Sequence, residues 1–312
     1  MKPAVSIVLP TFNRLQFLRL TIESVFAQTF ADWELIIADD GSDEPTRQYL
    51  RTLASEPRVK LLWLEHSGIP AVVRNAGLAE ARADHVAFLD SDDLWEPRKL
   101  QRQFEVLRAR DSCHWIYTAF TQVDGSGRSL PEEIHRRWVP HEGSVFERMA
   151  TGRISIRTPS VLATRELIIR AGRFDETISS GEDYDLWMRM ALESDLAVID
   201  EPLVHVRRHD ENHSRNWHLA YHGRDHTLAK LQPRVDPARR ALLRSERVKN
   251  GLKLAAEYAS LGERANVVRT LHVAFGYSWP YAHWWRDAFK ILVRRYVPQR
   301  LLNMYRAHSR GA

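Results

Sequence analysis

The feature that most constrains the fold is a short apolar run that leads directly into a cluster of carboxylates. The segment 86–89 (Val-Ala-Phe-Leu) is uniformly apolar and too short for an amphipathic helix, which predicts a buried strand. Three acids follow within four positions, at Asp90, Asp92 and Asp93. Alternate residues of an extended segment point to the same side, so Asp90 and Asp92 are expected to face one site. Carboxylates this close repel each other unless a cation binds, and hard oxygen ligands favour Mg2+ or Mn2+.

A purely structural role is the alternative for these acids. Asp92 or Asp93 could cap a helix that is predicted to begin near Glu96 and Pro97. One carboxylate suffices for a cap, however, and three acids are better explained by a site for a metal and a diphosphate. Open α/β sheets place such ligands at the carboxyl ends of parallel strands.

The first third of the chain alternates between strand and helix patterns. Apolar, β-branched runs predict strands at 5–9, 33–38, 59–64 and 86–89, and apolar residues at helical spacing predict helices at 15–28, 45–54 and 69–82. This βαβαβαβ order predicts an α/β fold with a mostly parallel sheet, right-handed crossovers and helices on both faces.

The rest of the chain is mixed and then helical. We predict strands at 115–120 and 197–199, helices at 166–171 and 184–193, and an irregular basic loop at 128–157. Helical patterns dominate from Trp217 onward, and a helix at 239–260 is predicted to end at Gly262.

One C-terminal segment has an unusual distribution of charge. Aromatic and apolar residues line one face of the predicted helix at 281–296, and cations lie away from that face. Between residues 280 and 310 seven Lys or Arg accompany one acid, Asp287. Such a helix suits peripheral contact with an anionic membrane, and a helix packed on the catalytic domain with a solvated basic face is the alternative.

Composition narrows the class of protein. The formal net charge of +5 is compatible with anionic substrates or an anionic membrane surface, and no nucleic-acid-binding signature is present, so we expect no nucleic-acid partner. A single cysteine cannot form an intrachain disulfide, which favours a reducing compartment. The N-terminal apolar run is too short for a signal peptide, and no stretch approaches ~18 uninterrupted apolar residues. These features predict a cytoplasmic protein.

Five short motifs occur in a characteristic order. They are PTFNR at 10–14, ADDGS at 38–42, VVRNAG at 72–77, FLDSDD at 88–93 and GEDYDLW at 181–187. Together they resemble glycosyltransferase family 2. The resemblance covers about residues 4–215 and implies a GT-A fold that binds a nucleotide-diphospho-sugar with a divalent metal and transfers the sugar with inversion. It divides the chain into a catalytic domain at 1–215, with a nucleotide-sugar half at about 1–110 and an acceptor half at about 111–215, and a helical C-terminal extension at 216–312.

The resemblance implies a set of nucleotide-sugar contacts. Phe12 would stack on the base, Asp40 would accept the imide N–H, and Arg74 would lie near the phosphates. Phe12 could instead pack in the core. Asp39 or Asp40 could form a turn before Gly41, and Arg74 could lie on the surface of a helix. The full set of implied contacts is Pro10, Thr11, Phe12, Asn13, Asp39, Asp40, Arg74, Asp90 and Ser91.

The resemblance also implies a metal site for Mn2+ or Mg2+. Asp92 would be the main ligand, with Asp90 and Asp93 as further candidates. A histidine later in such chains completes the metal or pyrophosphate contacts, and His209 is the candidate here, in competition with His205 and His213. Arg207 and Arg208 could hold phosphate or lie on the surface.

The GEDYDLW motif implies the catalytic base. The acceptor hydroxyl needs a carboxylate to take its proton, and Asp183 is the first candidate, followed by Glu182. Either acid could instead cap the helix that follows. Trp187, one turn later, could line the acceptor site, although a core position is the more common role.

These observations predict an inverting glycosyltransferase that takes a UDP- or dTDP-sugar and acts on a hydroxyl of a cell-envelope or exported glycan, including one carried on a polyprenyl lipid. A sugar-nucleotide pyrophosphorylase is one alternative, but it would need a glycine-rich loop where this chain has Pro10 to Asn13. A degenerate fold that only binds sugar nucleotide, or acts as a scaffold, is the other. No GxSxG elbow, GxGxxG fingerprint or Walker A motif is present.

Overall fold

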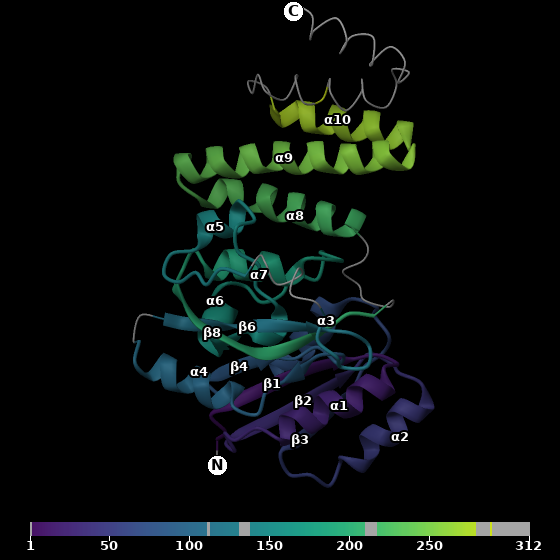
Figure 1. Ribbon diagram of the computed structural model, residues 1–312, viewed down its shortest axis with the longest axis vertical. Coiled ribbons are helices and arrows are strands. Elements are labelled where there is room, and N and C mark those ends of the chain that lie inside the picture. The colour runs from purple at the N-terminus through teal and green to yellow at the C-terminus, as the bar shows by residue number, and fades with distance from the viewer. Residues whose placement is uncertain (1, 111–112, 131–137, 210–216, 279–287, 289–312) are drawn as a thin grey trace, which may run out of the picture. The chain divides into compact units, whose positions relative to one another are not determined.

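The computed structural model describes residues 2–110, 113–130, 138–209, 217–278 and 288 (Figure 1). The chain forms two compact units, Met1–Arg215 and Asn216–Ala312.

The described part of the first unit is built on one mixed eight-stranded sheet with the strand order β3-β2-β1-β4-β7-β6-β8-β5. Strands β1, β2, β3 and β4 are parallel, β7 runs antiparallel to both β4 and β6, and β6 and β8 are again parallel. The short strand β5 pairs antiparallel with β8. The strands span Val5–Thr11 (β1), Trp33–Asp39 (β2), Val59–Trp63 (β3), His85–Phe88 (β4), Leu94–Trp95 (β5), Cys113–Val123 (β6), Leu162–Thr164 (β7) and Asp195–Arg207 (β8).

Helices cover both faces of this sheet. Alternate residues of β1 point to opposite faces: Ile7 and Leu9 join the apolar cluster with helices α1, α2 and α4, whereas Val8 faces α3. A Cβ atom on Gly77 of α3 would lie 2.6 Å from Val8 Cγ1, so only glycine permits this approach of helix to strand. The helices span Leu15–Phe26 (α1), Glu44–Thr52 (α2), Pro70–Ala79 (α3), Lys99–Arg108 (α4), Phe146–Ala150 (α5), Arg165–Arg170 (α6) and Glu182–Met190 (α7), with a 3-10 turn at Thr158–Ser160 (η2).

The predicted alternation of strands and helices in the first third is confirmed, with ends that differ by a few residues. The alternative of Asp92 or Asp93 as a helix cap is wrong, because α4 begins at Lys99 and its N-cap, Arg98, makes no side-chain capping bond. The segment predicted as an irregular loop contains α5. Strand β8 is thirteen residues long instead of three, because the polar pair Asp200 and Glu201 interrupts its apolar pattern without ending the strand.

The second unit is helical in its described residues. Its elements are α8 (Trp217–Leu231), a 3-10 turn η4 (Gln232–Arg234), α9 (Pro237–Leu261) and α10 (Arg264–Ser278). Asp236 caps α9 by accepting the N–H groups of residues 238 and 239, and Gly262 ends it with a φ of 80°, as predicted. Apolar residues of α9 and α10 form its core.

The structure bears on one of the two predictions about the membrane. The basic helix predicted at 281–296 lies outside the described residues, apart from the buried Ala288. None of the helices in the described ranges has an apolar stretch of the length and hydropathy needed to cross a bilayer.

Candidate active site

The ends of three parallel strands bring distant acidic motifs to one edge of the sheet. The register pairs Thr11 at the end of β1 with Asp39 at the end of β2, and β4 flanks β1 on its other side. A cavity of about 470 Å³ opens at this edge. The predicted site residues that line it are Pro10, Thr11, Phe12, Asp40, Arg74, Asp90, Ser91, Asp92, Asp93, Glu182 and Asp183.

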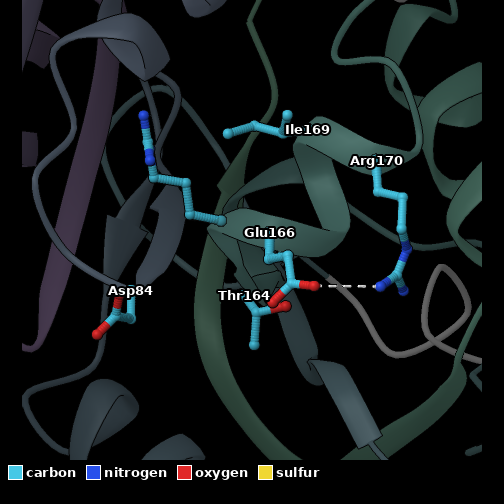
Figure 2. A pocket seen from close by; sticks show the side chains of 6 residues that line it. Asp84, Thr164, Glu166, Ile169 and Arg170 are labelled. Atoms are coloured by element: carbon cyan, nitrogen blue, oxygen red, sulfur yellow. Dashed lines mark hydrogen bonds and ion pairs between the residues drawn. The ribbon is translucent and has the colours of Figure 1, made fainter.

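A second hollow lies away from these motifs, around β7 and α6. Figure 2 shows Asp84, Thr164 and Glu166 among its lining side chains, with an ion pair between Glu166 and Arg170. None of the predicted site residues lines it, so it does not compete as the location of the predicted chemistry.

The loop after β1 presents an aromatic face to the cavity. Phe12 is 39% exposed and stacks on His66 with ring centroids 4.1 Å apart, so the alternative of core packing is wrong. The next residue, Asn13, has a φ of 53° and accepts the Asp43 N–H at 2.6 Å through Oδ1. Asn13 thus connects the loops after β1 and β2 and does not line the cavity itself.

The two aspartates after β2 have different partners. Asp39 is buried and accepts the Ser42 N–H, which makes it the residue of the predicted turn, and it also pairs with Arg47. Asp40 Oδ1 accepts the N–H and the hydroxyl of Ser67, and Oδ2 accepts the Gly68 N–H at 2.9 Å. His66 Nδ1 also lies 3.1 Å from Asp40 Oδ2, so this carboxylate connects the loop after β2 to the segment after β3.

Arg74 joins two acidic motifs. Its Nη2 donates to Asp90 Oδ1 at 2.6 Å and its Nη1 donates to Glu182 Oε1 at 2.5 Å. Burial lowers the pKa of this guanidinium, but the charges of Asp90 and Glu182 outweigh burial and raise it. The side chain is buried, so the alternative of a surface helix arginine is wrong.

The turn after β4 is surrounded by cations. Asp92 Oδ2 accepts from Arg14 Nη1 and lies 2.9 Å from His209 Nε2. Arg207 donates through Nε to the carbonyl of Asp92 at 2.8 Å and is fully buried, so its predicted surface alternative is wrong. The fold therefore brings His209, the histidine candidate, to the Asp92 carboxylate, and its role toward a metal or pyrophosphate stays a prediction.

Asp93 points toward β8. Its Oδ1 accepts the backbone N–H of Arg207 at 2.8 Å, and its side chain is almost fully buried. Burial, followed by the charges of Asp92 and Asp90, raises its pKa well above the ordinary value. Ser91 is also buried, and its carbonyl accepts the Thr21 hydroxyl at 3.0 Å.

The chemistry of this donor set suits a hard divalent cation. A carboxylate and an imidazole meet at Asp92 and His209, and Asp90 stands two positions earlier. Within the described ranges, no three His, Cys, Asp or Glu side chains converge as a ready set of ligands, because arginines hold Asp90 and Asp92.

The two acids of the GEDYDLW motif separate at the start of α7. Gly181, with a φ of 83°, turns the chain into the helix, and Glu182 turns to Arg74. Asp183 Oδ1 accepts the Tyr184 N–H at 2.7 Å and Oδ2 accepts the Thr158 hydroxyl at 3.0 Å. Burial, followed by the charge of Glu182, raises the pKa of Asp183 to about 6, although Arg74 and both hydrogen bonds oppose the shift.

Two further candidates, Trp187 and His205, do not line the cavity. Trp187 is 1% exposed and packs against Trp115 and Phe88, so it belongs to the core and does not line an acceptor site. His205 lies 2.5 Å from Glu96, and His213 lies outside the described residues.

Among the lining residues without a predicted role are two arginines, a histidine and a threonine. Arg14 was part of the PTFNR motif but had no assigned role, and His66 follows the third strand without belonging to a motif. Arg157 is the last residue of the segment predicted as an irregular loop and Thr158 follows it, and no local pattern marks either residue. Only the tertiary fold brings them beside Asp183.

Comparison with known proteins identifies the family. Residues 6–166 match the model of "Glycosyl transferase family 2", and the chain belongs to this family. A glycosyltransferase of Rickettsia felis without an assigned activity is 30% identical over 203 residues, which are 65% of this chain and 33% of that protein. The chain spans about a third of the length of three such Rickettsia relatives.

A further relative has a more specific name. The Escherichia coli protein "UDP-Glc:alpha-D-GlcNAc-diphosphoundecaprenol beta-1,3-glucosyltransferase WfgD" is 28% identical over 196 residues, which are 63% of this chain and 73% of that protein.

Solved structures show the same fold. TarS 1–349 from S. aureus has a TM-score of 0.67 at 18% identity and covers 89% of this chain and 81% of its own. The same fragment has also been solved with UDP-GlcNAc, with a TM-score of 0.58. The mannosyltransferase PcManGT from Pyrobaculum calidifontis, in complex with GDP-Man and Mn2+, has a TM-score of 0.61 at 17% identity and covers 94% of this chain and 86% of its own. The GT-A-like α/β fold expected from the sequence is therefore confirmed.

Proposed function

We propose that this protein transfers a sugar from a nucleotide-diphospho-sugar to an acceptor hydroxyl by a single displacement that inverts the anomeric carbon. The observation that carries this proposal is Asp183, a carboxylate with a pKa of about 6 that lines the same cavity as the acidic turn after β4. A base with a pKa near neutrality is ionised at physiological pH and still accepts a proton effectively.

Each side of the cavity has a role in this mechanism. Phe12 and His66 offer an aromatic surface for the nucleobase, and Asp40, which lines the same cavity, would accept the imide N–H in place of one of its present donors. Arg74 would contact the phosphates after its guanidinium releases Asp90. Asp183 takes the proton of the acceptor hydroxyl as the acceptor oxygen attacks the anomeric carbon.

Mn2+ or Mg2+ fits the same mechanism. Asp92 would be its main ligand, with His209 and Asp90 as further ligands and Asp93 as the least favoured because β8 engages its carboxylate. When bound, the cation would offset negative charge on the departing diphosphate. Arg14 and Arg74 balance the carboxylates here, so binding of a cation would free them to turn toward phosphate.

The substrates are proposed from chemistry and from relatives. A UDP- or dTDP-sugar is the favoured donor because WfgD is named for UDP-Glc and TarS has been solved with UDP-GlcNAc. The favoured acceptor is a hydroxyl of a cell-envelope or exported glycan, including a lipid-linked one, since WfgD is named for a diphosphoundecaprenol acceptor. Membership of a transferase family favours transfer over the pyrophosphorylase alternative.

Ligand-induced stabilisation tests the donor. The melting temperature is measured against a panel of nucleotides and nucleotide-sugars, with and without Mn2+. A ligand at 100 times its dissociation constant adds about 2.7 kcal/mol to the free energy of unfolding. We expect a metal-dependent rise in melting temperature with one family of nucleoside diphosphates. If no ligand of the panel changed the melting temperature, the proposal would be wrong.

A substitution at the base separates an enzyme from a degenerate binder. Asp183→Asn keeps the size of the side chain but cannot take the proton, so we expect turnover of the donor to fall about 10³-fold. Nucleotide affinity should be retained, because the substituted group contacts the acceptor side. Asp175→Asn, a half-buried acid on the preceding loop that does not line the cavity, is the control. Full activity of Asp183→Asn would remove Asp183 as the base.

We also propose peripheral contact with the cytoplasmic face of an anionic membrane through the basic segment at 281–296. The sequence places Arg286, Lys290 and Arg294 away from its aromatic face. Replacing all three with Glu in the full chain should reduce sedimentation with phosphatidylserine vesicles, and the wild-type effect should weaken with salt. Unchanged sedimentation would remove this proposal.

A further inference from the structure

Arg157 differs from the other cations of the cavity. It directly precedes the turn η2 and lines the cavity, and its guanidinium carbon lies 5.3 Å from the centroid of the Phe120 ring. Its Nε is buried without a hydrogen-bond partner. Within the described ranges, its guanidinium makes neither an ion pair nor a hydrogen bond with another side chain.

The neighbouring cations are all engaged by carboxylates. Arg14 holds Asp92, and Arg74 holds both Asp90 and Glu182. These contacts engage Arg14 and Arg74 and leave Arg157 as a positive charge that no acid contacts among the described residues. A guanidinium partly withdrawn from water without an anion carries an uncompensated desolvation cost, which a bound anion would remove.

The position of Arg157 indicates which anion it would meet. The next residue, Thr158, donates to Asp183, so Arg157 stands beside the candidate base. Asp93, at the end of the acidic turn, lines the same cavity as Arg157. An anion at Arg157 would therefore lie between the base and the turn, where the bond to the sugar breaks. A planar set of five N–H donors matches phosphate oxygens well.

We propose that Arg157 binds a phosphate group at the reaction centre, namely the diphosphate of the donor as it departs. This inference rests on the proposed function. As the acceptor oxygen bonds to the anomeric carbon and Asp183 takes its proton, the bond from that carbon to the diphosphate oxygen breaks. Both electrons of this bond stay on the diphosphate, and Arg157 stabilises that negative charge. A phosphate on a lipid-linked acceptor has the same chemistry and is the second source that the experiment must distinguish.

The test compares phosphate binding by the full chain and by two glutamine variants. Isothermal titration with inorganic pyrophosphate and Mg2+ is performed on wild type, on Arg157→Gln and on Arg153→Gln, an exposed arginine four residues earlier that does not line the cavity. We expect Arg157→Gln to weaken pyrophosphate binding at least 10-fold, as removal of a charge-assisted contact should. Arg153→Gln should bind as wild type does, and equal melting temperatures of the three proteins establish that each is folded.

Two further titrations distinguish the sources of the phosphate. UDP should lose affinity in Arg157→Gln by the same factor, whereas uridine, which lacks the diphosphate, should not. If UDP binding is unchanged but inorganic phosphate no longer binds the UDP-saturated variant, the phosphate belongs to the acceptor. Arg157→Lys, which keeps the charge but not the planar fork, should fall between wild type and Arg157→Gln.

Failure of this inference can be separated from failure of the proposed function. If wild type and Arg157→Gln bind pyrophosphate, UDP and phosphate equally, or if wild type does not bind pyrophosphate, Arg157 has no such role. If wild type is stabilised by no nucleoside diphosphate in the panel described above, the transferase proposal itself fails.

Discussion

Two pairs of neighbouring acids line the cavity, Asp92 with Asp93 and Glu182 with Asp183, and the partners of their side chains differ. In each pair an arginine holds one acid: Arg14 meets Asp92, which also lies beside His209, and Arg74 meets Glu182. The other acid in each pair has a raised pKa, for which burial is the largest cause and the charge of its neighbour the next.

The partners of those second acids make the difference. Asp93 is almost fully buried and accepts a backbone N–H of β8, which ties its carboxylate to the sheet. Asp183 is more exposed; one of its oxygens accepts the Tyr184 N–H, and the other accepts the hydroxyl of Thr158, a side chain of a neighbouring turn. A backbone donor cannot move away without breaking the strand, whereas a threonine hydroxyl can rotate when the carboxylate takes a proton. The comparison indicates a structural role for Asp93 and a chemical one for Asp183.

The largest effect is expected from removing the cation that holds Glu182. Arg74→Met leaves Glu182 and Asp90 without their partner, and breaking a buried ion pair costs about 3 kcal/mol. We expect the free energy of unfolding to fall by about that amount in urea denaturation followed by tryptophan fluorescence.

Two matched variants sharpen this prediction. Arg14→Met should cost less than Arg74→Met, because Asp92 keeps its contact with His209. Arg51→Met removes an exposed pair with Glu44 and should change stability by less than about 0.5 kcal/mol. If Arg74→Met and Arg51→Met had equal effects, the contact between Arg74 and Glu182 would not stabilise the fold.

An intermediate effect is expected at Thr158. Thr158→Val keeps the shape of the side chain but removes the hydroxyl that donates to Asp183. This hydrogen bond favours the ionised carboxylate, so its loss should raise the pKa of Asp183 above about 6. Transfer needs the ionised base and is lost as the pH falls through that pKa. The acid limb of kcat/KM should therefore move to higher pH by about one unit, since a charge-assisted hydrogen bond contributes about 1.5 kcal/mol.

A conservative variant provides the control for Thr158. Thr158→Ser keeps the hydroxyl, so its acid limb should coincide with that of wild type. UDP affinity should be the same in all three proteins. An acid limb that stays in place in Thr158→Val would show that this hydroxyl does not act on the base.

The smallest effect is expected at Lys99, which supports the turn that contains Thr158 through two successive hydrogen bonds. Lys99 is fully buried and donates to Gln103 at 2.9 Å, and Gln103 in turn donates to the carbonyl of Ser160 at 2.9 Å. Burial lowers the pKa of Lys99 well below its ordinary value of 10.5. Between the two pKa values the unfolded chain binds a proton that the folded chain does not, so stability rises with pH in that window.

Lys99→Met should remove that dependence. One proton contributes a slope of at most about 1.4 kcal/mol per pH unit, and the variant should lack this part of the slope in urea denaturations just below pH 10.5. Lys60→Met, at a half-exposed position, should leave the slope as in wild type. Identical slopes in wild type and Lys99→Met would mean that Lys99 keeps its proton in the folded state.

Much of the site could be predicted from local patterns. The apolar runs before Thr11, Asp39 and Asp90 identify buried strands, and parallel pairing necessarily brings their carboxyl ends to one edge. The convergence of the strand-end motifs therefore followed from the sequence. His209 could be placed beside the acidic turn only through the resemblance to a family, because nothing in its own segment marks it.

The partners of the acids could not be predicted in this way. Arg74 looks like an ordinary helical arginine, and only the packing of α3 and α7 against the sheet buries it between two acids that lie 16 and 108 positions away. Arg157 and Thr158 stand in a segment without periodicity, 26 and 25 positions before Asp183. The sequence by itself determined the first four strands, the order of the motifs that follow them, and the edge of the sheet at which the acids meet. These features depend on local apolar patterns and on the direction of parallel strands. The tertiary structure decided which acid is paired and which keeps a raised pKa, because burial and charge depend on side chains that lie far apart in the chain.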